Sequence, residues 1–89
     1  MALTLTLQEG QGFYVGNRRW YVESFDDNGV DLIGPDGQKV RVTEKESVEI
    51  EPEVFAQEGF IPEMGCRIAL EAPRKIAILR DDLYDRSRT

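Results

Sequence analysis

The chain has 89 residues, a formal net charge of −6, one cysteine and no histidine. A chain this short forms one domain with a small core, so that oligomer formation would help it to fold. The single cysteine excludes an intrachain disulfide and favours a reducing compartment, and the lack of histidine removes the commonest acid–base catalyst and metal ligand.

No apolar run approaches the length of a membrane span, and the first residues lack the pattern of a signal peptide. We therefore expect a cytoplasmic protein with no membrane contact. The paired carboxylates at residues 26–27 and 81–82 are typical of turns and helix starts rather than of general acid–base catalysis. The sequence thus predicts a protein that is not an enzyme and that holds no cofactor or metal.

Strand patterns follow one another along the first half of the chain. Leucine and threonine alternate over residues 3–7, which predicts a half-buried strand with leucines on one face. Aromatic and β-branched residues at 13–15 and 20–22 predict further strands. Turn motifs at residues 27–29 and 34–37 then separate strands at 30–33 and 39–43.

The second half continues with predicted strands at residues 47–50, from residue 54, and at 66–70, where Cys66 reads as a small core residue. A turn at Ala72 and Pro73 precedes a predicted last strand over residues 75–79. Asp81 and Asp82 then open a short helix, because acids suit the positive end of the helix dipole. The predicted fold is therefore mainly all-β, built from short antiparallel strands with a short C-terminal helix.

The acidity of the chain is local. Residues 26–65 carry eleven acidic and three basic side chains, whereas the remaining residues carry six acidic and eight basic ones. The middle segment thus has a net charge of −8 and the rest a net charge of +2. A polyanion can therefore meet a mildly basic face if the fold turns the middle segment away.

Both ends of the chain carry a series of short motifs. Residues 67–86 read Arg-Ile-Ala-Leu-Glu-Ala-Pro-Arg-Lys-Ile-Ala-Ile-Leu-Arg-Asp-Asp-Leu-Tyr-Asp-Arg. This run resembles the end of the carbon storage regulator family of RNA-binding translational regulators, and matches the family's Arg-Ile strand, Ala-Pro turn, apolar strand, arginine, two acids, aliphatic residue and tyrosine, in order and without a gap. The Leu-Thr-Leu-Thr at residues 3–6, Gly10 and the Val-Gly at residues 15–16 follow the spacing of the family's first strand and turn.

The resemblance implies an intertwined or barrel-like dimer of small five-stranded units, in which each RNA site joins the first strand of one subunit to the last strand of the other. The expected ligands are GGA-containing loops of messenger RNA or small regulatory RNA. Such single-stranded recognition uses base edges and backbone groups, with arginine on phosphate or base. The residues that match the family's RNA-binding positions are Thr6, Ala72, Pro73, Arg74, Ile78 and Arg80.

Two departures from the family pattern affect this interpretation. Leu7 and Gln8 stand where the family has two arginines, which weakens the electrostatic contribution to RNA affinity. The chain is also longer than the family's members, because residues 26–65 form either an acidic insertion or a partial internal duplication. A shift of 36 residues supports duplication, placing Leu32 on Ile68 and residue 42 on Ile78, in which case the second copy lacks its first strand.

These observations leave two functional hypotheses. The first is a divergent RNA-binding post-transcriptional regulator, present as a homodimer or as a single-chain pseudo-dimer with one composite site. The second is a protein-interaction module that kept the fold, lost RNA binding, and pairs with or antagonises an authentic family member.

Overall fold

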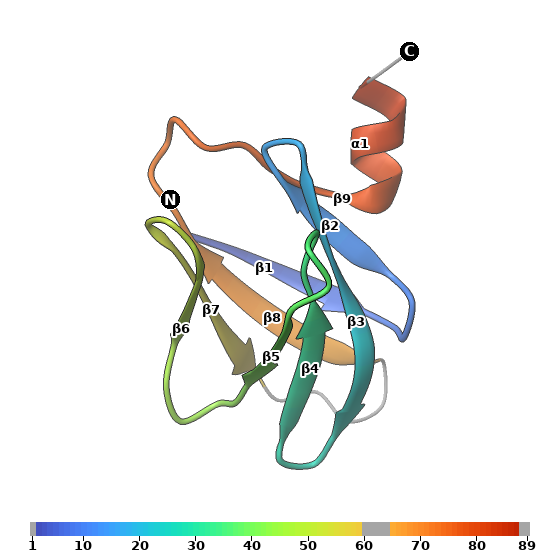
Figure 1. Cartoon of the computed structure of the whole chain (residues 1–89), viewed down its shortest axis with the longest axis vertical. Coiled ribbons are helices and arrows are strands. Elements are labelled where there is room, and N and C mark those ends of the chain that lie inside the picture. Colours follow the sequence, from blue (N-terminus) through green and yellow to red (C-terminus); the bar gives the residue numbers. More distant parts are fainter. Residues whose placement is uncertain (1, 60–64, 88–89) are drawn as a thin grey trace.

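A computed structural model describes residues 2–59 and 65–87, which form nine strands and one helix (Figure 1). The strands make two antiparallel sheets, so that the predicted fold class is confirmed. Sheet A has the order β1 (Ala2–Leu7), β8 (Cys66–Glu71), β7 (Val54–Gly59) and β6 (Val48–Glu51). Sheet B has the order β5 (Lys39–Val42), β4 (Gly29–Ile33), β3 (Arg18–Asp26), β2 (Gly12–Val15) and β9 (Ile78–Arg80), and α1 spans Asp81–Ser87.

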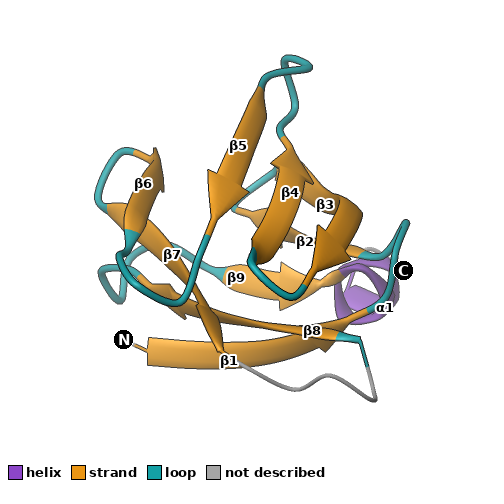
Figure 2. Cartoon of the chain, turned by 90° about the horizontal axis from the view of Figure 1, so that it is seen from below, coloured by secondary structure: helices purple, strands orange, loops and turns teal. Residues whose placement is uncertain are grey.

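The two sheets form layers that enclose one core (Figure 2). Alternation along the strands sends every second side chain inward, so that Leu5 and Leu7 of β1 are buried while Thr4 and Thr6, which alternate with them, are more exposed. Trp20 and Phe13 are the largest fully buried side chains. The described strands do not close into a barrel, although the Glu58 N–H donates to the Thr43 carbonyl at 3.1 Å and joins the end of β5 to β7.

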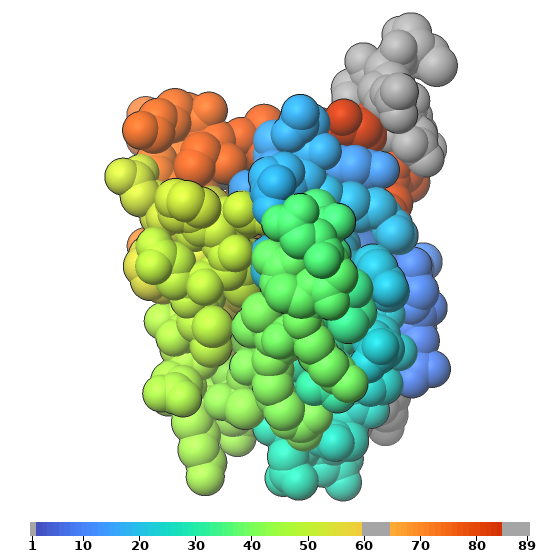
Figure 3. All heavy atoms as spheres, viewed as in Figure 1, coloured from blue at the N-terminus to red at the C-terminus, as the bar shows by residue number. Residues whose placement is uncertain are grey.

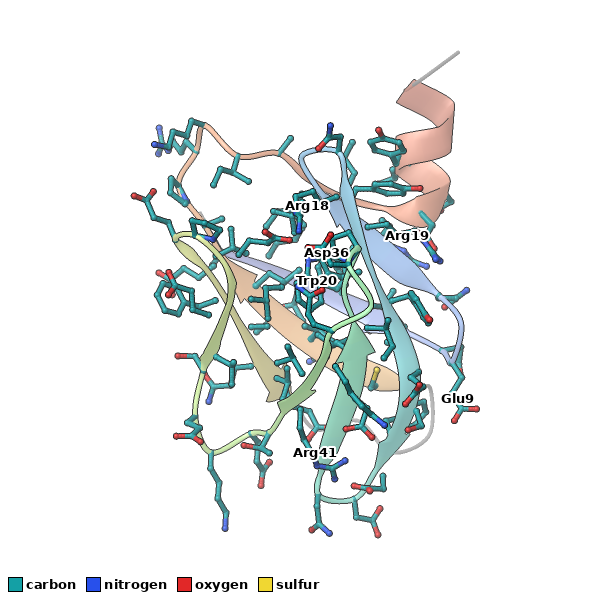
Figure 4. All side chains as sticks on the ribbon, viewed as in Figure 1. Glu9, Arg18, Arg19, Trp20, Asp36 and Arg41 are labelled. Atoms are coloured by element: carbon teal, nitrogen blue, oxygen red, sulfur yellow. The ribbon has the colours of Figure 1, made fainter. Side chains whose placement is uncertain are left out.

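One acidic side chain bonds across the two layers. Glu51, at the end of β6, has only 11% of its side chain exposed. It accepts a hydrogen bond from Trp20 Nε1 at 2.8 Å and from Arg18 Nε at 2.9 Å, and Arg18 also pairs with Asp36. Figure 4 shows Arg18, Trp20 and Asp36 gathered in this central region. The hydrogen bond to Glu51 is the main reason why the pKa of the Arg18 guanidinium is raised, and the bond to Asp36 is the second.

The last strand is shorter than predicted. Residues 75–77 lie outside the sheets, because Pro73 begins a turn that the Ile76 N–H closes by donating to the Pro73 carbonyl at 3.0 Å. The strand begins at Ile78, which pairs with Val15. The prediction of a strand over residues 75–79 was therefore wrong at its start.

The two sheets repeat each other along the chain. A shift of 36 residues carries β1 onto β5 and β2 onto β6, and aligns the starts of β3 and β4 with β7 and β8 to within one residue. The order β1-β8-β7-β6 then becomes β5-β4-β3-β2, and the pair Tyr21–Ile33 becomes Gln57–Ala69. In this alignment the first half comprises β1–β4 (residues 2–33), the second half comprises β5–β9 (residues 39–80), and β5 is the counterpart of β1. The comparison of sequence alone instead places residue 42 on Ile78, at the end of the chain. β9, beside β2, has no equivalent beside β6 in the part of the chain that the structure describes.

Candidate nucleic-acid interface

The end of β1 and the end of β9 lie together, although they come from opposite ends of the chain. Leu7 and Arg80 line one shallow cavity of about 160 Å³. The cavity is also lined by Gln11, Gly12, Asp81 and Asp82. Thr6 precedes Leu7 and pairs with Arg67 of β8, so that the structure brings the predicted residues Thr6 and Arg80 to the same end of the molecule.

The predicted turn residues lie at the other end of β1. Glu71, the last residue of β8, pairs with Ala2, and Ala72, Pro73 and Arg74 follow it directly. Ala2 and Thr6 are four positions apart, or about 13 Å along a strand. The segment from residue 72 to residue 80 therefore leads from one end of β1 to the other (Figure 1).

The six predicted residues differ in what they can offer a ligand. Ala72 and Ile78 are 4% and 5% exposed, so their side chains belong to the core and only their backbone groups remain for contact. Arg74 is exposed, whereas Pro73 and Thr6 are half-buried. The arginines are thus the predicted residues whose side chains can carry charge to a ligand.

Arg80 is already engaged within the chain. Its Nε lies 3.5 Å from Asp82 Oδ1, and 37% of its side chain is exposed. An ion pair at this exposure contributes little to stability, so Arg80 can exchange Asp82 for a phosphate or a base edge at small cost. The neighbouring acids keep the field at this cavity weak, because their charges oppose that of a polyanion.

Asp81 holds the start of α1 against sheet B. It accepts hydrogen bonds from the Gly12 N–H at 2.9 Å, from Arg19 Nε at 3.1 Å and from Arg19 Nη2 at 2.7 Å. The Arg19 bond is the main reason why the pKa of Asp81 is lowered. A side chain at Gly12 would overlap the Trp20 carbonyl, so this close packing requires glycine. Figure 4 shows Arg19 on the α1 side of β3.

An aromatic pair adds to this contact. The rings of Tyr14 on β2 and Tyr84 on α1 stack with centroids 3.6 Å apart and an angle of 11° between planes. Together with Asp81, this stack fixes the position of the helix that follows Arg80. Asp81 and Asp82 predict the helix start, but the sequence does not reveal its partners, because Arg19 and Asp81 are 62 residues apart and nothing in either segment indicates the other.

Most of the described cations are paired within the fold. Arg41 bonds to Asp26 and Asp31, and Lys39 bonds to Glu23. Among the described residues, the cations without an ion pair are Lys45, Arg67 and Arg74. Arg67 is not among the residues predicted to bind RNA, although the alternation of residues 66–70 already places it on the outer face.

Cys66 is a core residue, as predicted. It is 2% exposed, and its thiol donates to the Leu7 carbonyl at 3.4 Å. Burial raises the pKa of the thiol to about 11, so that the reactive thiolate is scarce at neutral pH.

Beyond this interface, sheet A has an exposed aromatic side chain. Phe55 on β7 is 40% exposed and lies at a hollow of about 540 Å³. The hollow is also lined by Ser47, Glu53, Glu71, Ala72 and Pro73. In Figure 3 the segment after β8 (orange) meets the residues near position 50 (yellow) at this end of the molecule.

Within residues 2–59 and 65–87, no cluster of three or more acidic or cysteine side chains is arranged to hold a metal ion. No helix of the described chain is both long and apolar enough to cross a membrane.

Comparison with protein-family models, curated proteins and solved structures gives no match to this chain.

Proposed function

We propose that the chain is a divergent carbon storage regulator-like protein that binds GGA-containing loops of messenger or small regulatory RNA in the cytoplasm and modulates translation. The observation that supports this proposal is the meeting of Leu7 and Arg80 in one cavity. The resemblance of the two chain ends implies a composite site between a first and a last strand, and in this fold β1 and β9 are the strands that approach each other. The function is binding, without catalysis and without a cofactor.

The repeat of the two sheets supports a single-chain pseudo-dimer. β1 from the first half completes the sheet of β6, β7 and β8, and β9 from the second half completes the sheet of β2, β3 and β4. An exchange of flanking strands between two halves is what an intertwined dimer achieves with two chains. Because β6 has no flanking strand like β9 among the described residues, only the site at β1 and β9 is complete.

The chemistry of the site indicates weak binding that depends on salt. Arg80, Arg74 and Arg67 supply positive charge around β1, whereas Leu7 and Gln8 supply none. Fewer cations displace fewer counterions from RNA, so the affinity falls less steeply with salt than it does for a strongly basic protein. Base edges would then be read mainly by backbone groups and Arg80.

The proposal is tested by calorimetric titration of an RNA hairpin with a GGA loop into the chain at low salt. We expect micromolar or tighter binding that Arg80→Ala reduces at least about tenfold, the loss of one charge-assisted contact. Lys45→Ala is the matched control, because it removes one exposed, unpaired cation inside the acidic segment, near the turn between β3 and β4. No binding at low salt, or equal losses in the two variants, would contradict the proposal.

A second candidate function is favoured by Phe55. The 36-residue shift makes Phe55 the counterpart of Arg19. In sheet B, Arg19 is bonded to Asp81 at the start of α1. Phe55 instead stays exposed beside Glu53 and Glu71. An apolar side chain with an acidic surround fits a basic protein surface, as expected of a module that pairs with or antagonises an authentic family member.

Binding to a purified authentic family member separates the two candidates. The second candidate requires a complex that Phe55→Ser weakens and that Arg80→Ala leaves intact. RNA binding with no such complex would favour the first candidate.

A further inference from the structure

β1 presents an open edge. One side of the strand pairs with β8 over all six residues, Ala2–Leu7. On the other side, its backbone groups bond to no other backbone group of the described chain. An open edge of this length is a template for another strand.

The other sheet edges carry features that oppose such pairing. β6 contains two glutamates and an irregularity between Glu49 and Glu51. β5 carries Lys39 and Arg41, and β9 has only three residues and continues into α1. Charges, bulges and short length all discourage strand addition. β1 contains only alanine, leucine and threonine, and so has none of these protections.

We propose that β1 pairs in antiparallel fashion with β1 of a second copy of this chain, about a two-fold axis at Thr4. The two four-stranded A sheets then form one continuous sheet. This dimer joins two complete chains by their edges, and differs from an exchange of strands between chains.

The register follows from the two faces of the strand. Opposed residues share a face, so the leucines stay on the core side only if leucine opposes leucine. With the axis at Thr4, Leu3 opposes Leu5 of the second copy and Ala2 opposes Thr6. Leu3 is half-buried in the single chain, and this pairing covers more of its apolar surface.

Charge also favours this register and a second copy as the partner. On the outer face, Arg67 of β8 lies beside Thr6 of β1 in one copy. Across the axis, Thr6 faces the alanine at position 2 of the second copy, which lies beside that copy's glutamate at position 71. Neither Arg67 nor Glu71 has an ion pair among the described residues. Opposite charges thus lie on one row, three strand spacings or about 14 Å apart at the backbone, with only small side chains between them. An axis at Leu5 does not align these charges.

The dimer does not depend on the proposed function. It uses the β1 edge at Thr6, which the RNA interface also uses, so RNA and a second copy exclude each other there. The dimer is measured without RNA, so that failure of RNA binding leaves its test unaffected.

The test is the mass in solution, by sedimentation equilibrium from micromolar to millimolar protein. We expect a mass that rises from one chain to two, because an edge of six residues makes a small interface. Thr4→Lys places two like charges directly opposite each other at the axis and should weaken the dimer at least about tenfold. Ala69→Lys is the matched control, because it adds the same charge to the same face one strand away from the edge, opposite Thr4. It should retain the dimer.

Hydrogen exchange gives a second measurement on the unmodified chain. The amides of residues 2–7 that point away from β8 should become more protected as the protein concentration rises, while those of β5 and β6 should not change. A single-chain mass at every concentration would overturn the proposal. A dimer that Thr4→Lys does not weaken, or that protects another edge, would also overturn it.

Discussion

Four strands of each sheet have the same order, but the two sheets contribute differently to the fold. In sheet B, the central strand β3 carries Trp20, and β2 is flanked by β9 and α1. In sheet A, the counterpart of Trp20 is Ala56, which is equally buried, and the edge of β6 has no described neighbour. Sheet B therefore contributes the two largest buried side chains, Trp20 and Phe13, and the packed helix, whereas sheet A contributes the open edge.

The edge strands of the two sheets also differ. β5 carries charges that pair within sheet B, and the residue after it bonds to β7. β1, which the 36-residue shift aligns with β5, contains no charged residue, and Leu7 at its end lines a cavity with Arg80. The uncharged, open edge thus lies in sheet A.

The largest expected effect comes from making the two central strands alike. Trp20→Ala gives β3 the small side chain that β7 has at Ala56. Because Trp20 is 0% exposed and donates to Glu51, the variant leaves a cavity and an acid without its partner. We expect a loss of about 3–5 kcal/mol in the free energy of unfolding, measured by urea denaturation followed by circular dichroism.

The matched control is Phe55→Ala, which removes an aromatic side chain from the exposed face of sheet A. It should cost less than about 1 kcal/mol. Equal losses in the two variants would mean that the core bulk is not concentrated at Trp20.

A smaller effect is expected where Asp81 bonds the start of α1 to sheet B. Asp81→Asn weakens the bonds to Arg19 and to the Gly12 N–H, and should cost about 1–2 kcal/mol at neutral pH, a range limited by partial exposure of the pair. Asp82→Asn, at a more exposed ion pair, should cost less than about 0.5 kcal/mol.

The stabilising effect of Asp81 should depend on pH in a defined direction. The folded-state pKa of Asp81 is lowered by Arg19, so its contribution is complete above the unfolded pKa of about 4 and is lost as the pH falls through the lowered value. The stability difference between the native chain and Asp81→Asn should therefore shrink on acidification below that pH. A difference that grows under acid would contradict the role of the Arg19 bond.

Local patterns predicted much of the fold. The alternation of residues 3–7 and 66–70 correctly placed Leu5, Leu7 and Cys66 in the core, and the turn motifs correctly separated the middle strands. The start of β9 was missed because residues 75–77 have the apolar content of a strand, while the turn at Pro73 takes them out of the sheet.

Long-range arrangement was harder to predict. Alternation shows which face of a strand is buried but does not name its neighbour, so the place of β5 as the counterpart of β1 required the sheet order. The approach of Leu7 to Arg80 was anticipated only through the family resemblance. The bonds of Asp81 and Glu51 join residues more than thirty positions apart, and no local pattern encodes them.

We propose that β1 and β9 of one chain form one composite RNA site. The stoichiometry of binding tests this proposal, by calorimetric titration of the GGA-loop hairpin at low salt. We expect one hairpin per chain, with the heat lost in Arg80→Ala and kept in Lys45→Ala. Two hairpins per chain, binding unaffected by Arg80→Ala, or no binding at all would contradict it.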